Sequence, residues 1–227
     1  MPSYDLILTG SEGFLGSKIR DFFSSKNLKV ACVDMKLNHD LEDERFVKEW
    51  FSANTAPVLI NAFGFNDKVT KVNINENFLD LELSEVKRFF NSNVFALFSV
   101  CREFIRTRKK GRIINFSSIY SVVSPRLDLY KKGSKNIAYG MSKAAVNQLT
   151  RNLAVVTAPN FSINTLVLGG FLENQDTEFI AQYEKQVPFK RLGNPSDLFD
   201  LLDFLSFAEC EYITGSQITV DGGWTIW

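Results

Sequence analysis

Short apolar segments alternate with amphipathic segments along this chain, and this alternation restricts the possible folds more than any other feature. Buried strands are predicted over residues 4–9, 28–34, 57–64, 111–118, 161–168 and 213–223. Helices are predicted between them over residues 14–26, 42–53, 81–108, 138–156 and 195–207. This order favours an α/β fold, a single doubly wound parallel sheet with helices on both faces and right-handed crossovers. Residues 1–227 are predicted to form a single domain.

The charge balance argues against two classes of partner. There are 26 basic residues (lysine and arginine) and 26 acidic residues (aspartate and glutamate), so the formal net charge is zero. The chain therefore has no electrostatic footprint for nucleic acid or an anionic membrane. It also lacks a secretory leader pattern and an apolar run near the ~20 residues of a membrane span. We predict a soluble, cytoplasmic protein that acts on a small molecule.

Cysteine and histidine usage argues against disulfides and metal. The three cysteines are odd in number and widely spaced, which suggests buried thiols in a reducing compartment. His39 is the only histidine, and no cluster has the spacing of metal ligands. We therefore predict no metal site.

A glycine-rich turn follows the first strand, with glycines at positions 10, 13 and 16. Such glycines permit a tight turn and a close approach of backbone to a pyrophosphate, while the next helix offers its first N–H groups to the phosphates. An ordinary turn between strand and helix would have the same composition. If the turn binds a dinucleotide, the contacts are predicted at Gly10, Gly13, Phe14 and Leu15.

The second predicted strand ends at Asp34. A carboxylate there can accept hydrogen bonds from both hydroxyls of an adenosine ribose, and it repels a 2′-phosphate, so NAD is favoured over NADP. Glu12 adds negative charge nearby, whereas Lys36 opposes it. Asp40 is either the N-cap of the helix over 42–53 or, together with Leu41, a contact for adenine.

Further candidates follow the later strands. Ligands of parallel sheets bind beyond the carboxyl ends of the strands. The residues predicted there are Asn61, Ala62 and Gly64 after the third strand, Ser118 at the end of the fourth, and Gly169, Gly170 and Phe171 after the fifth. Asn93 lies inside the helix predicted over 81–108, where asparagine is unfavourable, so it either marks a break or has a functional role.

Tyr139 and Lys143 lie four residues apart and therefore share one helix face. A neighbouring positive charge favours the phenolate form of tyrosine, which would let Tyr139 act as an acid/base near neutral pH. Among the six tyrosines only Tyr139 has a lysine four residues later. Taken alone, the pair also fits an exposed amphipathic helix.

The order of these motifs resembles that of one family over essentially the whole chain. The motifs are TGSEGFLG at 9–16, Asp34, NAFG at 61–64, Asn93, the serines 117–118, YGMSK at 139–143, the glycines 169–170 and DGG at 221–223. In this order they are similar to the short-chain dehydrogenase/reductase family, which implies a Rossmann fold.

The resemblance implies a role for each candidate catalytic residue. Tyr139 would be the acid/base, and Ser118, as the second serine of its pair, would bond to the substrate oxygen. Lys143 would bind the nicotinamide ribose and lower the pKa of the phenol, and Asn93 would hold a water in a proton relay. Relatives are commonly oligomers, so a homodimer or homotetramer is expected. It would use the helices near 81–108 and 138–156 and bury the apolar tail 224–227.

The chain also departs from the family pattern. Its glycine spacing resembles the sugar-nucleotide branch, Phe63 interrupts the usual turn, and Leu168 stands where the family mostly has proline. A long loop with lysines at 131, 132 and 135 resembles a bacterial subgroup of surface-polysaccharide and flagellin-sugar biosynthesis. These lysines suit a phosphorylated or nucleotide-linked substrate, or form a solvated loop.

The function expected from these observations is hydride transfer between NAD(H) and a secondary alcohol or ketone, with a sugar or nucleotide-linked sugar among the candidate substrates. Two alternatives remain open. One is a catalytically idle NAD-binding regulator or scaffold. The other is an epimerase or dehydratase of sugar nucleotides that retains its NAD. A serine hydrolase is disfavoured because His39 is the only histidine base.

Overall fold

A computed structural model of the protein describes residues 3–66, 78–130 and 135–227, so Lys131 and Lys132 lie outside the described residues. The described strands form one parallel sheet in the order β2-β1-β3-β4-β5-β6, which confirms the predicted fold class. Their bounds are β1 Leu6–Thr9, β2 Val30–Val33, β3 Val58–Asn61, β4 Gly111–Ser118, β5 Phe161–Leu168 and β6 Gln217–Val220. Residues 213–215, predicted as strand, lie outside β6.

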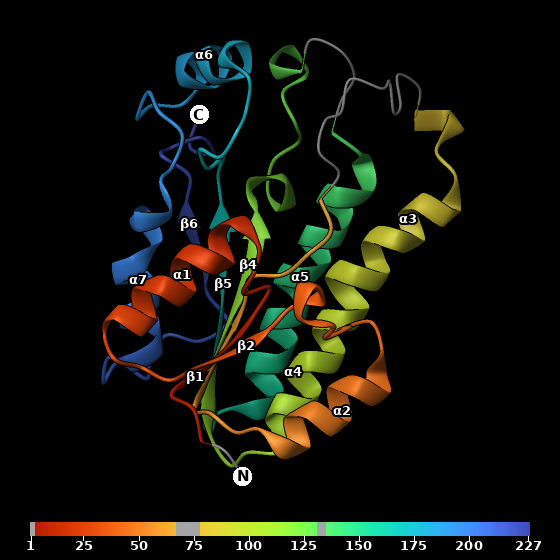
Figure 1. The fold of residues 1–227 in the computed structure, drawn as a ribbon. Helices are drawn as coiled ribbons and strands as arrows, with labels where there is room; N and C mark the ends of the chain where they lie inside the picture. The colour runs from red at the N-terminus through yellow and green to blue at the C-terminus, as the bar shows by residue number, and fades with distance from the viewer. Residues whose placement is uncertain (1–2, 67–77, 131–134) are drawn as a thin grey trace.

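Helices cover both faces of the sheet (Figure 1). On one face lie α1 (Phe14–Ser25) and α7 (Phe199–Phe207), and on the other lie α2 (Glu44–Ala53), α4 (Ala96–Arg106) and α5 (Ile137–Thr157). Side chains alternate between the two faces, as in any strand. Leu6 and Leu8 pack in the cluster that contains the α1 and α7 residues, whereas Ile7 packs in the cluster of α2, α4 and α5.

The helix predicted over residues 81–108 is interrupted at its centre. It consists of α3 (Leu83–Phe90), a π-helical turn (Asn91–Phe95) and α4. Asn93 lies within the turn and is buried, and its side chain forms two hydrogen bonds with the backbone of Phe65. The Asn93 side chain thus points into the protein interior. The α-helix is interrupted at this residue, where asparagine has low helix propensity.

The first turn of α2 overturns the prediction for Asp40 as a helix cap. The helix begins at Glu44, and Asp43 Oδ1 accepts a hydrogen bond of 2.9 Å from the Arg45 amide. Asp40 Oδ1 instead accepts from the amide of Glu42, in the preceding turn. Two acids three residues apart could each cap a helix, and the structure uses the second of them.

The helix α6 (Thr177–Gln186) was not predicted, because residues 171–191 have only weak apolar periodicity. Within α6 only Tyr183 is buried. The helix lies at the end of the molecule near the C-terminus, away from the N-terminus (Figure 1).

Among the residues that the structure describes, no helix has both the length and the apolar character needed to cross a membrane. Within the same residues, no three histidine, cysteine, aspartate or glutamate side chains gather as metal ligands would. The three cysteines are free thiols.

A row of buried polar side chains crosses the middle of the sheet. Thr9 Oγ1 donates to Asn61 Oδ1 at 2.8 Å, and Asn61 Nδ2 donates to Asn115 Oδ1 at 2.8 Å. Asn115 Nδ2 then donates to Thr150 Oγ1 of α5 at 2.9 Å. Thr9, Asn61 and Asn115 are register partners on β1, β3 and β4, so the row ties three strands and one helix together. We call these four residues the polar row.

The polar row should contribute strongly to stability. Asn115→Ala removes the donor to the Thr150 hydroxyl and the oxygen acceptor of the Asn61 amide, which keeps a weak contact with Cys101 Sγ at 3.5 Å. Because both groups are buried, the free energy of unfolding should fall by roughly 2–4 kcal/mol. Urea unfolding followed by circular dichroism measures this change. The exposed Asn152, whose Oδ1 accepts from Gln148, provides the control Asn152→Ala, which should change stability by less than about 0.5 kcal/mol. Equal effects of the two variants would contradict the role of the row.

Candidate active site

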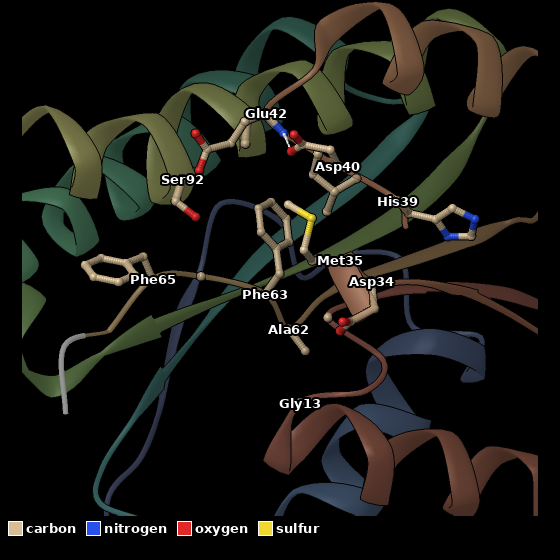
Figure 2. A pocket seen from close by; sticks show the side chains of 14 residues that line it. Gly13, Asp34, Met35, His39, Asp40, Glu42, Ala62, Phe63, Phe65 and Ser92 are labelled. Atoms are coloured by element: carbon tan, nitrogen blue, oxygen red, sulfur yellow. Dashed lines mark hydrogen bonds between the residues drawn. The ribbon is translucent and has the colours of Figure 1, made fainter. Parts of the chain in front are cut away.

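The strand order creates a crevice at one end of the sheet. The chain passes from β1 to β2 on one side and then to β3 on the other side of β1, and ligands of open α/β sheets bind at such a point. A cavity of about 300 Å³ opens there. It runs from Gly13 and Asp34 to Phe65 and Ser92 (Figure 2). Seven of the predicted cofactor residues line it: Gly10, Gly13, Asp34, Asp40, Leu41, Ala62 and Gly64.

Gly10 shows why the turn after β1 requires glycine. Its φ angle is +73°, and a Cβ atom on it would lie 2.6 Å from the Phe63 nitrogen. The turn can therefore contact the backbone of the segment after β3 only if residue 10 has no side chain. Directly after this turn α1 begins, and Phe14 and Leu15 occupy its first turn. N–H groups at this position lack partners within the helix, and they favour an anion.

Asp34 is held by two backbone amides. Its Oδ2 accepts from Glu12 at 3.0 Å and its Oδ1 from Lys36 at 2.9 Å. Each carboxylate oxygen has a further acceptor site, so the group can still receive ribose hydroxyls. The nearby cations contact Glu12: its carboxylate forms an ion pair with Arg20, and its backbone carbonyl accepts a hydrogen bond from the Lys36 ammonium.

The residues that line the cavity differ in part from the predicted cofactor residues. The side chain of Asn61 does not line it, because this amide belongs to the polar row. Residues that line it without having been predicted are Met35, His39, Glu42, Phe63, Phe65, Ser92 and Ala96. Several of them directly follow β2 or β3, so their place after a strand was a usable signal. His39 borders the cavity and stacks on Phe46.

Lys143 and Asn93 lie at the Gly64 end of the cavity. A Cβ atom on Gly64 would be 3.0 Å from Asn93 Oδ1 and 3.1 Å from Lys143 Nζ. Lys143 is only 6% exposed, and its ammonium donates to the Phe116 carbonyl at 3.0 Å. Burial lowers the pKa of Lys143 to about 8, because an ammonium is disfavoured away from water. At neutral pH this buried group is thus a cation that is close to losing its proton.

Asn93 connects the π-helical turn to the helix that carries Tyr139. Its Nδ2 donates to Ser142 Oγ at 2.9 Å, and that hydroxyl donates to the Tyr139 carbonyl at 2.8 Å. Tyr139 is buried, and its ring packs edge-on against Phe89. The ammonium of Lys135 lies 5.1 Å from the centre of the Tyr139 ring.

The two serines at the end of β4 have different partners. Ser117 Oγ donates to the Lys143 carbonyl at 3.0 Å, which ties β4 to α5. Ser118 Oγ accepts from the Tyr120 amide at 3.2 Å and caps the short helix Ile119–Ser121. The α5 helix packs closely on this segment, since a Cβ atom on Gly140 would lie 2.8 Å from the Tyr120 carbonyl. The four predicted catalytic residues thus come from the π-helical turn, β4 and α5, and α5 packs against each of the other two.

The residues after β5 are Gly169, Gly170 and Phe171. Gly170 and Phe171 line a second cavity, of about 310 Å³, next to the end of β6. An ion pair between Arg191 and Asp197 borders it, with 2.6 Å between Nη1 and Oδ2. These predicted contacts therefore do not line the cavity that contains Gly10 and Asp34.

The buried ammonium of Lys143 should make stability depend on pH. Below about pH 8 the lysine is charged in both the folded and the unfolded chain, so its burial penalty acts in full. Between about 8 and the ordinary value near ~10.4, the folded chain loses the proton first and the penalty fades. We therefore compare the free energy of unfolding of Lys143→Met with that of the native chain at each pH. This difference should favour the variant by roughly 2–3 kcal/mol more at pH 7 than at pH 10.

Urea unfolding of both proteins at the two pH values measures this double difference. The exposed Lys48 of α2 provides the control Lys48→Met, whose effect should be equal at both pH values. The same result for Lys143→Met would show that burial does not shift the titration of this group.

The fold and the cavity define a class of protein. An open parallel sheet with a glycine turn before α1, and an acid at the end of β2, is the architecture of dinucleotide-binding domains. Residues 23–225 match the family model described as enoyl-(acyl carrier protein) reductase. The chain belongs to the short-chain dehydrogenase/reductase family, a family of oxidoreductases.

Individual relatives agree with this assignment. The chain is 35% identical over 129 residues to post-translational flagellin modification protein A of Campylobacter coli, which covers 54% of this chain and 50% of that protein. It is 30% identical to the 7alpha-hydroxysteroid dehydrogenase of Clostridium sardiniense, over 74% of this chain and 63% of that enzyme. A short-chain dehydrogenase from Leptospira borgpetersenii, solved with bound NAD+, superposes with a TM-score of 0.84 at 30% identity, over 97% of this chain and 92% of that one.

Proposed function

We propose that this protein transfers a hydride between NAD(H) and a secondary alcohol or ketone, with Tyr139 as the acid/base. The observation that carries the proposal is the position of Lys143. Its buried ammonium lies next to Gly64, at one end of the cavity, and the side-chain oxygen of Asn93 lies next to the same glycine. A glycine that lines the cavity therefore lies next to a buried cation on the helix of the candidate phenol.

The residues that would hold the dinucleotide fit its parts. The Gly10 turn and the first turn of α1 suit the pyrophosphate, and the Asp34 carboxylate suits the adenosine ribose. The adenine side of the cavity is bordered by Asp40, Leu41 and Ala62. We assign the nicotinamide half to the segment Gly169, Gly170 and Phe171, together with Tyr139 and Lys143. When bound, the nicotinamide supplies or accepts the hydride.

The chain's own residues would handle the proton. Ser118 would hydrogen-bond to the substrate oxygen, and Tyr139 would donate a proton to that oxygen during reduction. Lys143, which is charged below about pH 8, would stabilise the phenolate that remains. Both amide hydrogens of Asn93 already have partners, so a relay water could be held only through its oxygen atoms.

The proposal extends to the substrate class, a sugar or nucleotide-linked sugar. Lys135 supports it, because its ammonium lies over the ring of Tyr139 and donates to Asn66 Oδ1. A cation beside the candidate acid/base suits an anionic group on the substrate. The relative named as a flagellin modification protein points to the same class.

The assembly as a homodimer or homotetramer is also a proposal. Phe95 and Phe98, at the start of α4, expose large apolar surfaces that a subunit contact would bury. A subunit contact was expected to bury the tail 224–227, and Trp224 is already buried within its own chain. Trp227 is 66% exposed, although its indole N–H donates to the Gln186 carbonyl.

The first experiment replaces the candidate acid/base. Tyr139→Phe removes only the hydroxyl, so turnover with NAD(H) and a panel of sugars, polyols and nucleotide sugars should fall by roughly 10²–10⁴-fold. NAD affinity, measured by calorimetric titration, should stay nearly unchanged. The fully exposed Tyr212 provides the control Tyr212→Phe, which should retain full turnover.

The other outcomes distinguish the alternatives. A native protein that binds NAD but turns over no compound of the panel would favour an idle regulator or scaffold. A protein purified with NAD that isomerises or dehydrates a sugar nucleotide without net cofactor reduction would favour an epimerase or dehydratase. Loss of NAD binding in Tyr139→Phe would show a structural role for the phenol.

The preference for NAD is assigned to the charge of Asp34. Asp34→Ser removes the charge but keeps an oxygen that can cap the Lys36 amide. NAD should bind roughly tenfold more weakly, because charged acceptors form the stronger hydrogen bonds, and the preference for NAD over NADP should shrink. Calorimetric titration with both dinucleotides measures the ratio.

A matched control comes from the cap of α2. Asp43 also accepts from two backbone amides, but it does not line the cavity. Asp43→Ser should therefore leave both dinucleotide affinities unchanged. An unaltered NAD to NADP ratio in Asp34→Ser would assign the discrimination to another residue.

A further inference from the structure

Tyr183 of α6 contacts the turn that follows β5. Its hydroxyl accepts a hydrogen bond of 2.8 Å from the Gly170 amide. The ring is 2% exposed and stacks on Trp224, with 4.5 Å between ring centroids and an interplanar angle of 14°. This aromatic pair places the phenol oxygen firmly at the backbone of the turn.

The neighbouring backbone groups of the turn have partners in the main chain. The Gly169 amide donates to the Val220 carbonyl at 2.9 Å, and the Gly193 amide donates to the Gly170 carbonyl at 2.9 Å. The Leu172 amide donates to the Gly193 carbonyl at 2.8 Å. The Gly170 amide differs from these groups because its acceptor is a side chain, so its position depends on a residue that can be changed without altering the backbone.

Contact between the ring and the turn is close. A Cβ atom on Gly170 would lie 2.9 Å from Cε2 of Tyr183. Two consecutive glycines have unusual backbone freedom, and ordering them costs more conformational entropy than ordering other residues. The phenol therefore adds a side-chain restraint to a turn that the main-chain hydrogen bonds already hold in part.

We propose that Tyr183 is a positioning residue that holds the Gly169–Gly170 turn, through the Gly170 amide, in the conformation that receives the nicotinamide half of the dinucleotide. The inference rests on the proposed function. Tyr183 would act on the cofactor through the turn, and the adenosine half, at the cavity that contains Gly10 and Asp34, would be independent of it. Burial raises the pKa of Tyr183, so its hydroxyl is neutral near pH 7 and its bond to the amide is intact there.

The test compares two ligands that share the adenosine half. NAD contains the nicotinamide, whereas ADP-ribose lacks it. Tyr183→Phe preserves the ring and its stacking on Trp224 but removes the acceptor of the Gly170 amide. NAD should bind roughly tenfold more weakly to this variant than to the native protein, while the affinity for ADP-ribose should stay the same. Calorimetric titration measures both, and Tyr212→Phe, which changes a fully exposed tyrosine, should alter neither.

Three results would overturn the inference. Unchanged NAD affinity in Tyr183→Phe would show that the hydroxyl does not position the turn. An equal loss of affinity for NAD and ADP-ribose, with a lower melting temperature, would show a general structural role. A native protein that binds ADP-ribose and NAD equally well would show that the turn makes no contribution to binding. Absence of binding of either ligand to the native protein would instead remove the proposed function, and this inference with it.

Discussion

The hydrogen bonds of the polar row hold together the part of the protein on which the candidate site depends. Thr9 and Asn61 lie at the carboxyl ends of β1 and β3, directly before the Gly10 turn and the segment that contains Gly64. Asn115 continues the row to β4. A buried amide must find partners for its donors and acceptor, so a shift in the register of these strands would leave several groups unsatisfied. The row therefore fixes the register of β1, β3 and β4, and with it the relative positions of the segments that line the cavity.

At Lys143, burial is unfavourable for the charge that the proposed function would require. A buried ammonium is unfavourable, and the hydrogen bond to the Phe116 carbonyl compensates for it only in part. An interaction of this kind contributes little to folding, but it places a cation beside the helix turn that carries Tyr139. The opposite holds for Asn93, because both of its amide hydrogens have acceptors and its Oδ1 accepts from the Phe65 amide. The candidate catalytic residues thus include both a destabilising and a stabilising member.

Much of the architecture could be predicted because it follows from local patterns. Apolar runs of β4 and β5 mark strands with the bounds expected, and the turn at Gly10 needs glycine for steric reasons that the spacing already indicates. The helix α6 could not be predicted, because it buries only Tyr183 and so leaves a weak periodic signal. The cap of α2 was misplaced because Asp40 and Asp43 are equally suitable in sequence, and only the path of the preceding turn selects between them.

The sequence by itself determined the order of the strands along the chain, the positions of α1, α2, α5 and α7, the glycine turn, the acid at the end of β2 and the spacing of Tyr139 and Lys143. Each of these depends on residues that are near one another in the chain. The tertiary structure alone decided that Asn61 belongs to the polar row and that Phe63 borders the cavity. It also decided that Tyr183 reaches the turn after β5. These are contacts between segments far apart in the chain, and their partners depend on how whole elements pack, which no local pattern encodes.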